Sequence, residues 1–536
     1  MLQALSSTTS LVLLLAAALG FAVWRVFSSG LWSVPGPFVA RFTDLWYAYR
    51  IFRGRFEKDN VELHRKYGPV VRYGVNRYSI ADPLAANAIY GPGSKFTKSS
   101  WYQTWSSPSP GEWTLFTDQD AKRHASNRRQ YQNMYAMSAL VHYEEYVDEC
   151  AELLCQRLSG MCAEDAWSQP VDMGHWLQCY AFDVISLMTY SRRIGFLDAG
   201  RDVGNVMQNI EDALAYASVV GVYPRLHPVL FRVRNWIAGA RGKGRQYIIN
   251  FTKECMAAHQ AKPTGKPVVA ETDSEPPEND DQDQDQGRRQ QQQPTTMDFL
   301  SKFVQKNSDN PSAFTPYHVQ AGCVSNMIAG SDTTSISLSA ILYHALRNPA
   351  VFRRLREEVD RVCPRGGAAP SPPPRVTFAQ SQDMPYLQAV IKEALRVHPA
   401  TGLPLERVVP EEGLSFKGFF FPAGTIVGIN SWVEHGNKEI FGDDADAFNP
   451  DRWLQGDKEK ISLMNRHWMP FGLGSRTCIG RHISMLEMCK LVPRLVRDFD
   501  FTLCDEQEWQ TRNHWFVKPK NFKVLVRQRA VGGGQI

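Results

Sequence analysis

The stretch Phe471-Gly472-Leu473-Gly474-Ser475-Arg476-Thr477-Cys478-Ile479-Gly480 is the most informative part of this 536-residue chain. Three glycines flank a single cysteine, and an arginine lies two residues before it. Glycine lets the backbone adopt positive φ and approach a bulky planar group closely. A helix that begins after Cys478 would point its N–H groups at the sulfur and favour the thiolate. The pattern therefore predicts a cysteine thiolate exposed in a glycine-rich turn.

The thiolate has two possible roles, a structural one in the turn or that of a metal ligand. A zinc site needs three or four protein ligands, whereas haem iron takes one axial thiolate whose electron donation favours O–O cleavage. The stretch resembles the haem-binding signature F-G-x-G-x-R-x-C-x-G of the cytochromes P450, the haem-thiolate monooxygenases, and every specified position is present. The resemblance implies haem b as cofactor, Cys478 as the axial iron ligand, and Phe471, Arg476 and Gly480 as further cofactor-binding residues.

A second motif, Ala329-Gly330-Ser331-Asp332-Thr333-Thr334, interrupts an apolar helical pattern that runs from about Pro316 to Ala345. A glycine inside a helix costs about 1 kcal/mol relative to alanine, so this patch either bends the helix or leaves room for a ligand. A solvent-facing polar patch is the alternative, and the apolar flanks disfavour it. The motif resembles the family's A-G-x-D/E-T sequence. The resemblance implies that Thr333 organises hydrogen bonds around dioxygen and that Asp332 relays the protons that O–O cleavage requires.

A third motif contains Glu393 and Arg396, three residues apart and thus on one face of a helix. Such a pair is weak evidence alone, since an exposed pair contributes less than about 1 kcal/mol. Its sequence context resembles the E-x-x-R helix of the same family, and Arg452 resembles the third member of that family's buried triad. The resemblance implies a structural role for all three. Asp451 stands where the family more often has glutamate.

A fourth set of residues is cationic. Two haem propionates beside a buried macrocycle need positive partners, because unpaired buried charge is costly. His124 and Arg128 resemble the family's H-x-x-x-R stretch, and Arg407 resembles the arginine on the strand after the E-x-x-R helix. Together with Arg476 they form the predicted propionate-binding set.

The N-terminus resembles a membrane anchor. Residues 1–24 carry no charged side chain, and residues 11–24 are almost wholly apolar, although a span needs about 20 such residues. A cleaved signal peptide is the alternative. No basic segment precedes the apolar run and Arg25 follows it, which by the positive-inside rule leaves the bulk of the chain cytosolic. As in microsomal members of the family, we expect a single-pass anchor and hinge at residues 1–33 in the endoplasmic reticulum membrane.

The remaining sequence, residues 34–536, is expected to form one haem-thiolate domain. Helical patterns dominate residues 115–400, and short β-rich pieces occur near residues 70–80, 418–429 and 522–526. The resulting prediction is a mainly α fold with small β-sheets, the cytochrome P450 fold. Residues 263–296 are acidic and then glutamine-rich, so we expect a disordered insertion there. The net charge of +5 is modest, and no dense Lys/Arg block with interleaved aromatics predicts a nucleic-acid partner.

The resemblance implies a monooxygenase that uses O₂, electrons from NADPH-cytochrome P450 reductase, and a lipophilic small-molecule substrate. The segments 175–185 and 192–197 are similar to the fungal pisatin-demethylase-type branch, which implies secondary metabolism, with detoxification as an alternative. Two other classes stay open. A haem-thiolate isomerase or dehydratase needs neither O₂ nor reductase, but such relatives usually lack the Asp-Thr pair. The other class is a non-catalytic membrane haem protein. By position, the substrate pocket is expected to be lined by residues 97–116, by Ser325, Ile328 and Ala329, by residues 400–403, and by Trp515 with Phe516.

Overall fold

The computed structural model describes residues 31–109, 111–162, 167–238, 243–261, 297–365, 375–505 and 509–529, together with Gly20. Of the expected anchor and hinge, only Gly20 and residues 31–33 are therefore described, and the expected disordered insertion at residues 263–296 lies outside the described residues. Among the described residues, no helix is both long and apolar enough to cross a membrane.

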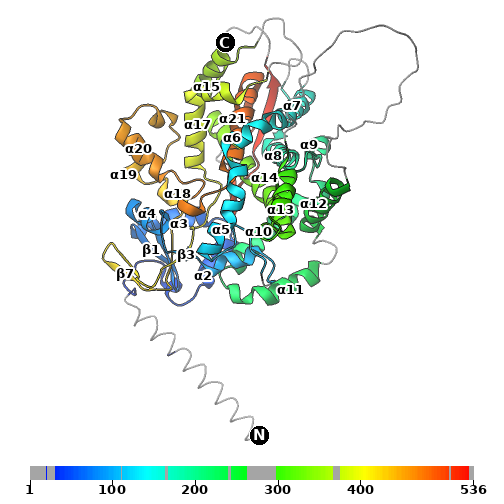
Figure 1. Cartoon of the computed structure of the whole chain (residues 1–536). Coiled ribbons are helices and arrows are strands. Elements are labelled where there is room, and N and C mark those ends of the chain that lie inside the picture. Colours follow the sequence, from blue (N-terminus) through cyan, green and yellow to red (C-terminus); the bar gives the residue numbers. More distant parts are fainter. Residues whose placement is uncertain are drawn as a thin grey trace, which may run out of the picture.

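Two long helices lie at the centre of the molecule. Helix α14 (Pro316–Arg347) packs along α8 (Met173–Tyr190), and both are surrounded by other helices in Figure 1. Gly330 lies at this contact, because a β-carbon there would stand 2.8 Å from Cγ1 of Ile185 in α8. The missing side chain lets the two helices approach closely. The glycine thus serves helix packing, a role that the sequence motif did not indicate.

The other helices of eight or more residues cover this pair and the sheets. The mainly helical fold predicted from the sequence is confirmed. These helices are α2 (Leu45–Phe52), α3 (Phe56–Tyr67), α4 (Pro83–Tyr90), α5 (Ala121–Tyr131), α7 (Glu144–Met161), α10 (Val206–Val220), α11 (His227–Ala238), α12 (Lys243–Ala261), α13 (Phe299–Asp309), α15 (Pro349–Val362), α17 (Pro385–Val397), α20 (Lys458–His467) and α21 (Arg481–Asp498).

Within the described ranges, the β-structure forms four small sheets. The largest has the strand order β1-β2-β8-β5-β3, and the parallel pairing of β2 with β8 joins the N-terminal part of the fold to the segment around residue 427. The second sheet has the order β4-β12-β9, and two hairpins, β6–β7 and β10–β11, complete the set. The strands are β1 (Val70–Gly74), β2 (Arg77–Ile80), β3 (Thr97–Lys98), β4 (Val171–Asp172), β5 (Arg407–Val408), β6 (Leu414–Phe416), β7 (Phe419–Phe421), β8 (Ile426–Gly428), β9 (Phe499–Leu503), β10 (Gln510–His514), β11 (Phe516–Lys520) and β12 (Lys523–Gln528).

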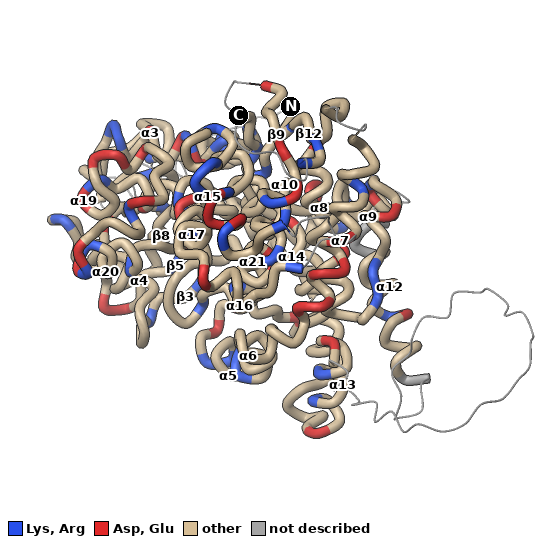
Figure 2. Tube along the Cα trace, turned by 90° about the horizontal axis from the view of Figure 1, so that it is seen from above, with Lys and Arg blue, Asp and Glu red and all other residues tan. Residues whose placement is uncertain are grey.

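Basic and acidic residues are interspersed along the described chain, as in α15 (Figure 2). Opposite charges three or four positions apart on a helix stabilise it modestly. In α15, Arg361 pairs in this way with Glu358 at 3.8 Å. The interspersed pattern agrees with the lack of a dense basic block in the sequence.

Candidate active site

The cysteine loop owes its shape to its glycines. Gly472 and Gly474 have φ values of +71° and +66°, a region that disfavours residues with a β-carbon. At Gly474 an added β-carbon would stand only 1.6 Å from the carbonyl oxygen of Tyr90, so no other residue fits there without a backbone shift. The Cys478 N–H donates to the carbonyl of Phe471 at 2.8 Å and closes the loop.

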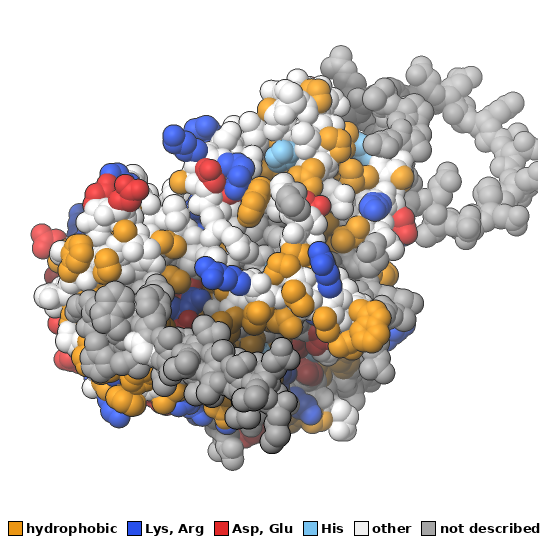
Figure 3. All heavy atoms as spheres, turned by 90° about the horizontal axis from the view of Figure 1, so that it is seen from below, with side chains coloured by type: hydrophobic (Ala, Val, Ile, Leu, Met, Phe, Trp, Pro, Cys, Tyr) orange, Lys and Arg blue, Asp and Glu red, His pale blue; other side chains and the backbone are white. Residues whose placement is uncertain are grey.

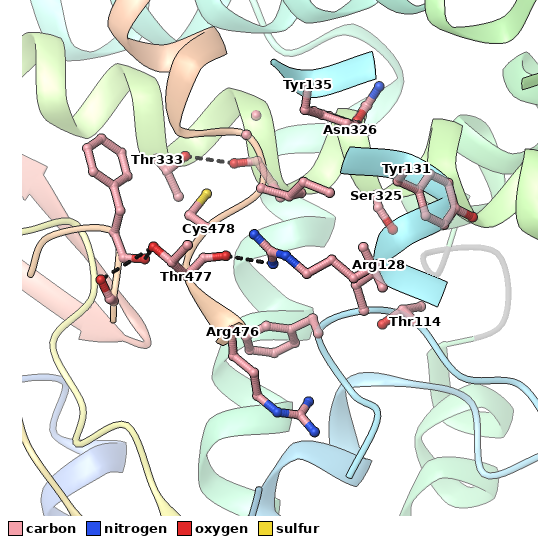
Figure 4. Close-up of a pocket in the computed structure, with 18 of the residues that line it drawn as sticks. Thr114, Arg128, Tyr131, Tyr135, Ser325, Asn326, Thr333, Arg476, Thr477 and Cys478 are labelled. Carbon is pink, nitrogen blue, oxygen red and sulfur yellow. Dashed lines mark hydrogen bonds between the residues drawn. The ribbon is translucent and has the colours of Figure 1, made fainter. Parts of the chain in front are cut away.

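Helix α21 begins at Arg481, just after the cysteine, as the sequence predicts. Burial raises the pKa of the Cys478 thiol, while the backbone N–H of Gly480, the guanidinium of Arg128 and the start of α21 lower it. Burial is the largest of these effects, so the pKa of the thiol lies above its usual value, and the surrounding donors oppose part of that rise. Cys478 is nevertheless exposed, because its side chain opens into a cavity (Figure 4).

This cavity, which we call the thiol cavity, encloses about 1880 Å³ including its solvent-open mouth. It lies between α5, α14, the cysteine loop and the tip of the β10–β11 hairpin. Most of its lining is apolar or aromatic. Residues expected from the sequence to contact a substrate that do line it are Trp113, Ser325, Ala329, Ala400, Trp515 and Phe516.

Two of the expected pocket residues lie behind this lining instead. Trp101 and Trp105 pack against Trp515 with ring centroids 5.1 and 5.8 Å apart. They support the aromatic wall from outside the cavity. Trp515 itself has a φ of +83°, which is unusual for a bulky residue and is held by the surrounding structure.

The four predicted cationic residues converge on the thiol cavity, since His124, Arg128, Arg407 and Arg476 all line it. Arg128 donates from Nη1 to the carbonyl of Thr477 at 2.8 Å, as Figure 4 shows. Arg476 donates from Nη1 to the carbonyl of Asp118 at 2.6 Å, but its buried Nη2 has no partner. Arg407 is 5% exposed and stacks over the ring of Tyr90 at 5.0 Å.

Lys98 is a fifth cation of this set, and no motif in the sequence identifies it. It sits on the two-residue strand β3 and donates from Nζ to the carbonyl of Phe116 at 2.5 Å. Burial, followed by the charges of Arg407 and Arg476, lowers the pKa of Lys98 well below its usual value. Its position depends on the pairing of β3 with β5, two strands about 300 residues apart in sequence, so local sequence carries no signal for it.

The basic side chains around the thiol cavity lower one another's pKa values. Burial and then Arg407 lower the pKa of Arg476 to about 10, and burial followed by Arg476, Lys98 and Arg128 lowers the pKa of His124 to about 3. Gathered positive charges in a buried place are costly without an anion. The orphaned Nη2 of Arg476 and this excess of cations fit a bound group that carries two carboxylates. The residues present therefore suit a propionate-bearing macrocycle beside Cys478.

Asp332 and Thr333 point to different sides of α14. Thr333 lines the thiol cavity and donates from Oγ1 to the carbonyl of Ala329 at 2.7 Å (Figure 4). The Asp332 carboxylate is fully buried on the other flank, where it accepts from Nε2 of Gln178 at 2.6 Å and pairs with Nζ of Lys518 at 2.8 Å. The structure thus brings Thr333, and not Asp332, to the cavity.

The predicted triad of Glu393, Arg396 and Arg452 is assembled in the interior. Glu393 receives Nε and Nη2 of Arg396 at 2.8 and 2.7 Å, and Nε of Arg452 at 2.9 Å. The indole of Trp453 adds a bond of 2.9 Å, and Asp444 also binds Arg452 at 2.9 Å. The last two partners were not predicted. Because every charge is paired, the cluster can fix the region behind the cavity without leaving a buried ion unsatisfied.

Comparison with known proteins identifies relatives over nearly the whole chain. The Cytochrome P450 family model matches residues 34–526. A cytochrome P450 monooxygenase of Aspergillus terreus is 38% identical over 87% of this chain and 89% of its own. A pisatin demethylase of Fusarium vanettenii is 34% identical over 95% of this chain and 90% of its own, and the cytochrome P450 monooxygenase cicH of Emericella nidulans is 35% identical over 92% and 93%. This chain belongs to the cytochrome P450 family, oxidoreductases that bind haem b through a cysteine thiolate.

Proposed function

We propose that this protein is a monooxygenase that binds haem b through Cys478 and uses O₂ to oxidise a lipophilic small molecule. One observation supports the proposal most strongly. The Cys478 thiol opens into a cavity at which three arginines gather with Lys98 and His124, and where Nη2 of Arg476 lacks a partner. Arg128, Arg407, Arg476, His124 and Lys98 would hold the two propionates, and Phe471 and Gly480 would flank the sulfur. The bound haem would supply the oxygen activation.

The chain's own residues have three tasks in this reaction. The cysteine loop directs the sulfur at the cavity, and the N–H groups at the start of α21 would stabilise the thiolate that binds the haem iron. Thr333 offers a hydroxyl inside the cavity, and Asp332 lies next to it in sequence as the acid that exchanges protons with solvent groups. The Glu393–Arg396–Arg452 triad fixes the region behind the cavity and takes no part in proton transfer.

The cavity lining defines the substrate class. Aromatic and aliphatic side chains dominate, among them Trp113, Phe116, Trp515 and Phe516, while Thr114, Ser325 and Asn326 are among those that supply polar groups. Such a lining suits an apolar molecule of moderate size that carries few polar groups. The relatives named above are fungal monooxygenases, one of which is a pisatin demethylase, so we place this protein in fungal secondary metabolism. Detoxification of a lipophilic compound is the alternative for the same site.

The enzyme needs a source of electrons and a place in the cell. We propose NADPH-cytochrome P450 reductase as the redox partner and the endoplasmic reticulum membrane as the location, with residues 1–33 as a single-pass anchor and the haem domain in the cytosol. One face of the described structure supports membrane contact, because large apolar side chains are exposed on it (Figure 3). These side chains are Phe38, Phe42, Leu45 and Phe52 near the short 3₁₀ helix η1 (Phe38–Arg41) and α2, and Val229, Val233, Trp236 and Ile237 on α11.

A carbon monoxide difference spectrum of the reduced full-length protein tests the cofactor assignment. We expect a thiolate-type band in the wild type and its loss in Cys478→Ser. A wild-type protein that binds haem without this band would contradict the assignment of Cys478. Product formation that requires NADPH, reductase and O₂ together then identifies a monooxygenase, whereas turnover without them would favour the isomerase or dehydratase class.

A further inference from the structure

A second cavity lies on the other side of α14 from the thiol cavity. Unlike the thiol cavity it is polar, and we call it the polar cavity. It is lined by Gln178 of α8, Ser335 and Ser339 of α14, Lys518 and Lys520 of β11, and several acidic residues. Both partners of the buried Asp332 carboxylate, Gln178 and Lys518, belong to this lining. Helix α14 therefore separates the two cavities. Thr333 faces the thiol cavity, whereas Asp332 binds two residues that line the polar cavity.

Strand β11 connects the two cavities. At its start, Trp515 and Phe516 line the thiol cavity, and two positions later Lys518 reaches Asp332. Alternate side chains of a strand share a face at a spacing of about 7 Å, so Phe516 and Lys518 point the same way. The strand is attached to the segment after α17, because Val517 N–H donates to the carbonyl of Ala400 at 2.8 Å and its own carbonyl accepts from His398 at 3.0 Å.

The ion pair determines where the Asp332 carboxylate can go. Burial disfavours an unpaired carboxylate, and Nζ of Lys518 lies 2.8 Å from Oδ2 of the fully buried Asp332, where the two form an ion pair. While this pair is closed, the carboxylate stays on the polar flank of α14 and away from the Thr333 side. Any displacement of β11 moves the Lys518 backbone and so changes the pairing.

We propose that Lys518 is a positioning residue that couples Asp332 to substrate contacts at the tip of the β10–β11 hairpin. The inference rests on the proposed function, in which Asp332 handles protons. A substrate that presses on Trp515 or Phe516 shifts β11, loosens the Lys518–Asp332 pair and frees the carboxylate to serve the thiol cavity. An empty cavity leaves the pair closed and the carboxylate withdrawn.

Infrared difference spectroscopy tests this coupling without turnover. Binding of clotrimazole, a bulky azole, to the full-length haem-loaded protein is expected to change a carboxylate band that Asp332→Asn abolishes. Lys518→Met should make that band insensitive to clotrimazole, and Lys518→Arg should restore the response because it retains the charge. Lys520→Met is the matched control, since Lys520 is on the same face of β11 and lines the same cavity.

A turnover measurement adds a second readout. With reductase and NADPH but no substrate, Lys518→Met is expected to raise the rate of peroxide release about tenfold over the wild type, because the freed carboxylate serves the thiol cavity before a substrate binds. Gly402→Ala should act in the same direction with Lys518 intact. A β-carbon at Gly402 would stand 2.4 Å from both Asn513 Nδ2 and Val517 Cγ2, so the hairpin must move.

The carbon monoxide spectrum tests the proposed function, and the response to clotrimazole tests the role of Lys518. If the wild type lacks the thiolate-type carbon monoxide band, the proposed function fails. If that band is normal but Lys518→Met and Lys520→Met respond alike to clotrimazole, the coupling is overturned. A thermal unfolding midpoint is measured for each variant, and should Lys518→Met not fold, Gly402→Ala carries the same test on the native lysine.

Discussion

At the scale of single residues, the cysteine loop depends on positions where no side chain is tolerated. Gly474 combines a φ of +66° with a predicted clash of 1.6 Å against Tyr90. Gly418, in the turn between β6 and β7, has a similar φ of +80° but open space around its β-carbon position. An alanine at Gly418 would therefore meet backbone strain alone, whereas an alanine at Gly474 would meet both backbone strain and a collision with Tyr90.

We predict that Gly474→Ala lowers the free energy of unfolding by at least about 3 kcal/mol and greatly reduces haem content, because the loop must shift away from Tyr90. Gly418→Ala should cost only about 1 kcal/mol, the price of the left-handed conformation. Denaturant unfolding and the haem absorbance per protein check both. Equal losses in the two variants would show that the collision does not matter.

His435, whose ring is buried, is a second residue whose effect on stability can be measured, because it depends on pH. Its Nδ1 donates to the carbonyl of Arg396 at 2.9 Å, and its Nε2 accepts from the N–H of Met469 at 2.9 Å. These bonds require the neutral ring. Burial, followed by the charge of Arg396, lowers the pKa of His435 to about 3.

The lowered pKa has a definite consequence for stability. Between pH 6.5 and about 3 the unfolded chain binds a proton at His435 that the folded protein does not, so stability falls as the pH decreases. We predict that the stability of the wild type relative to His435→Gln falls by up to about 1.4 kcal/mol per pH unit below 6.5. The difference should be constant between pH 7 and 8. Urea unfolding of both proteins across this range measures it, and a constant difference throughout would contradict the neutral-ring assignment.

At the scale of elements, the contact between α14 and α8 can be tested with a double-mutant cycle. Alanine has the higher helix propensity by about 1 kcal/mol, so Gly330→Ala would stabilise an isolated helix. In the protein it should destabilise, because the new β-carbon stands 2.8 Å from Ile185. In an Ile185→Ala background we predict that the sign reverses and Gly330→Ala becomes stabilising. Chemical unfolding of the four proteins measures the coupling, and additive effects would exclude a direct contact.

The elements also show what the sequence could and could not predict. The long helix around Asp332, the helix after Cys478 and the Glu393–Arg396 pair follow from local periodicity and spacing, and the structure contains all of them. The orientation of Asp332 did not follow, since neighbouring positions on a helix point about 100° apart and the motif cannot state which one faces a cavity. Lys98 was missed because the distant pairing of β3 with β5 places it. Lys518 was missed because the β10–β11 hairpin is local, and only its attachment to the segment after α17, through Val517 and Ala400, brings it to Asp332.

At the scale of the whole molecule, the apolar face on η1, α2 and α11 lies beside the N-terminal part of the described chain (Figure 3). Trp236 is 84% exposed and Ile237 is 71% exposed, both on α11. Exposed apolar side chains gathered on one face indicate a surface that contacts a partner or a membrane. Under the proposed location, the partner of this face is the lipid bilayer.

Trp236 reports directly on that contact. We predict that brominated lipids in phosphatidylcholine vesicles quench part of the tryptophan fluorescence of the full-length protein, because the exposed indole enters the acyl region. Trp236→Phe should remove that part of the quenching while the protein remains bound. Ile237→Lys should weaken the quenching by placing a charge in the apolar face. The effect should persist in 1 M salt, since screening at a Debye length of about 3 Å suppresses charge attraction but not apolar burial. If Trp236→Phe is quenched as strongly as the wild type, α11 does not enter the lipid and the apolar face serves a protein partner instead.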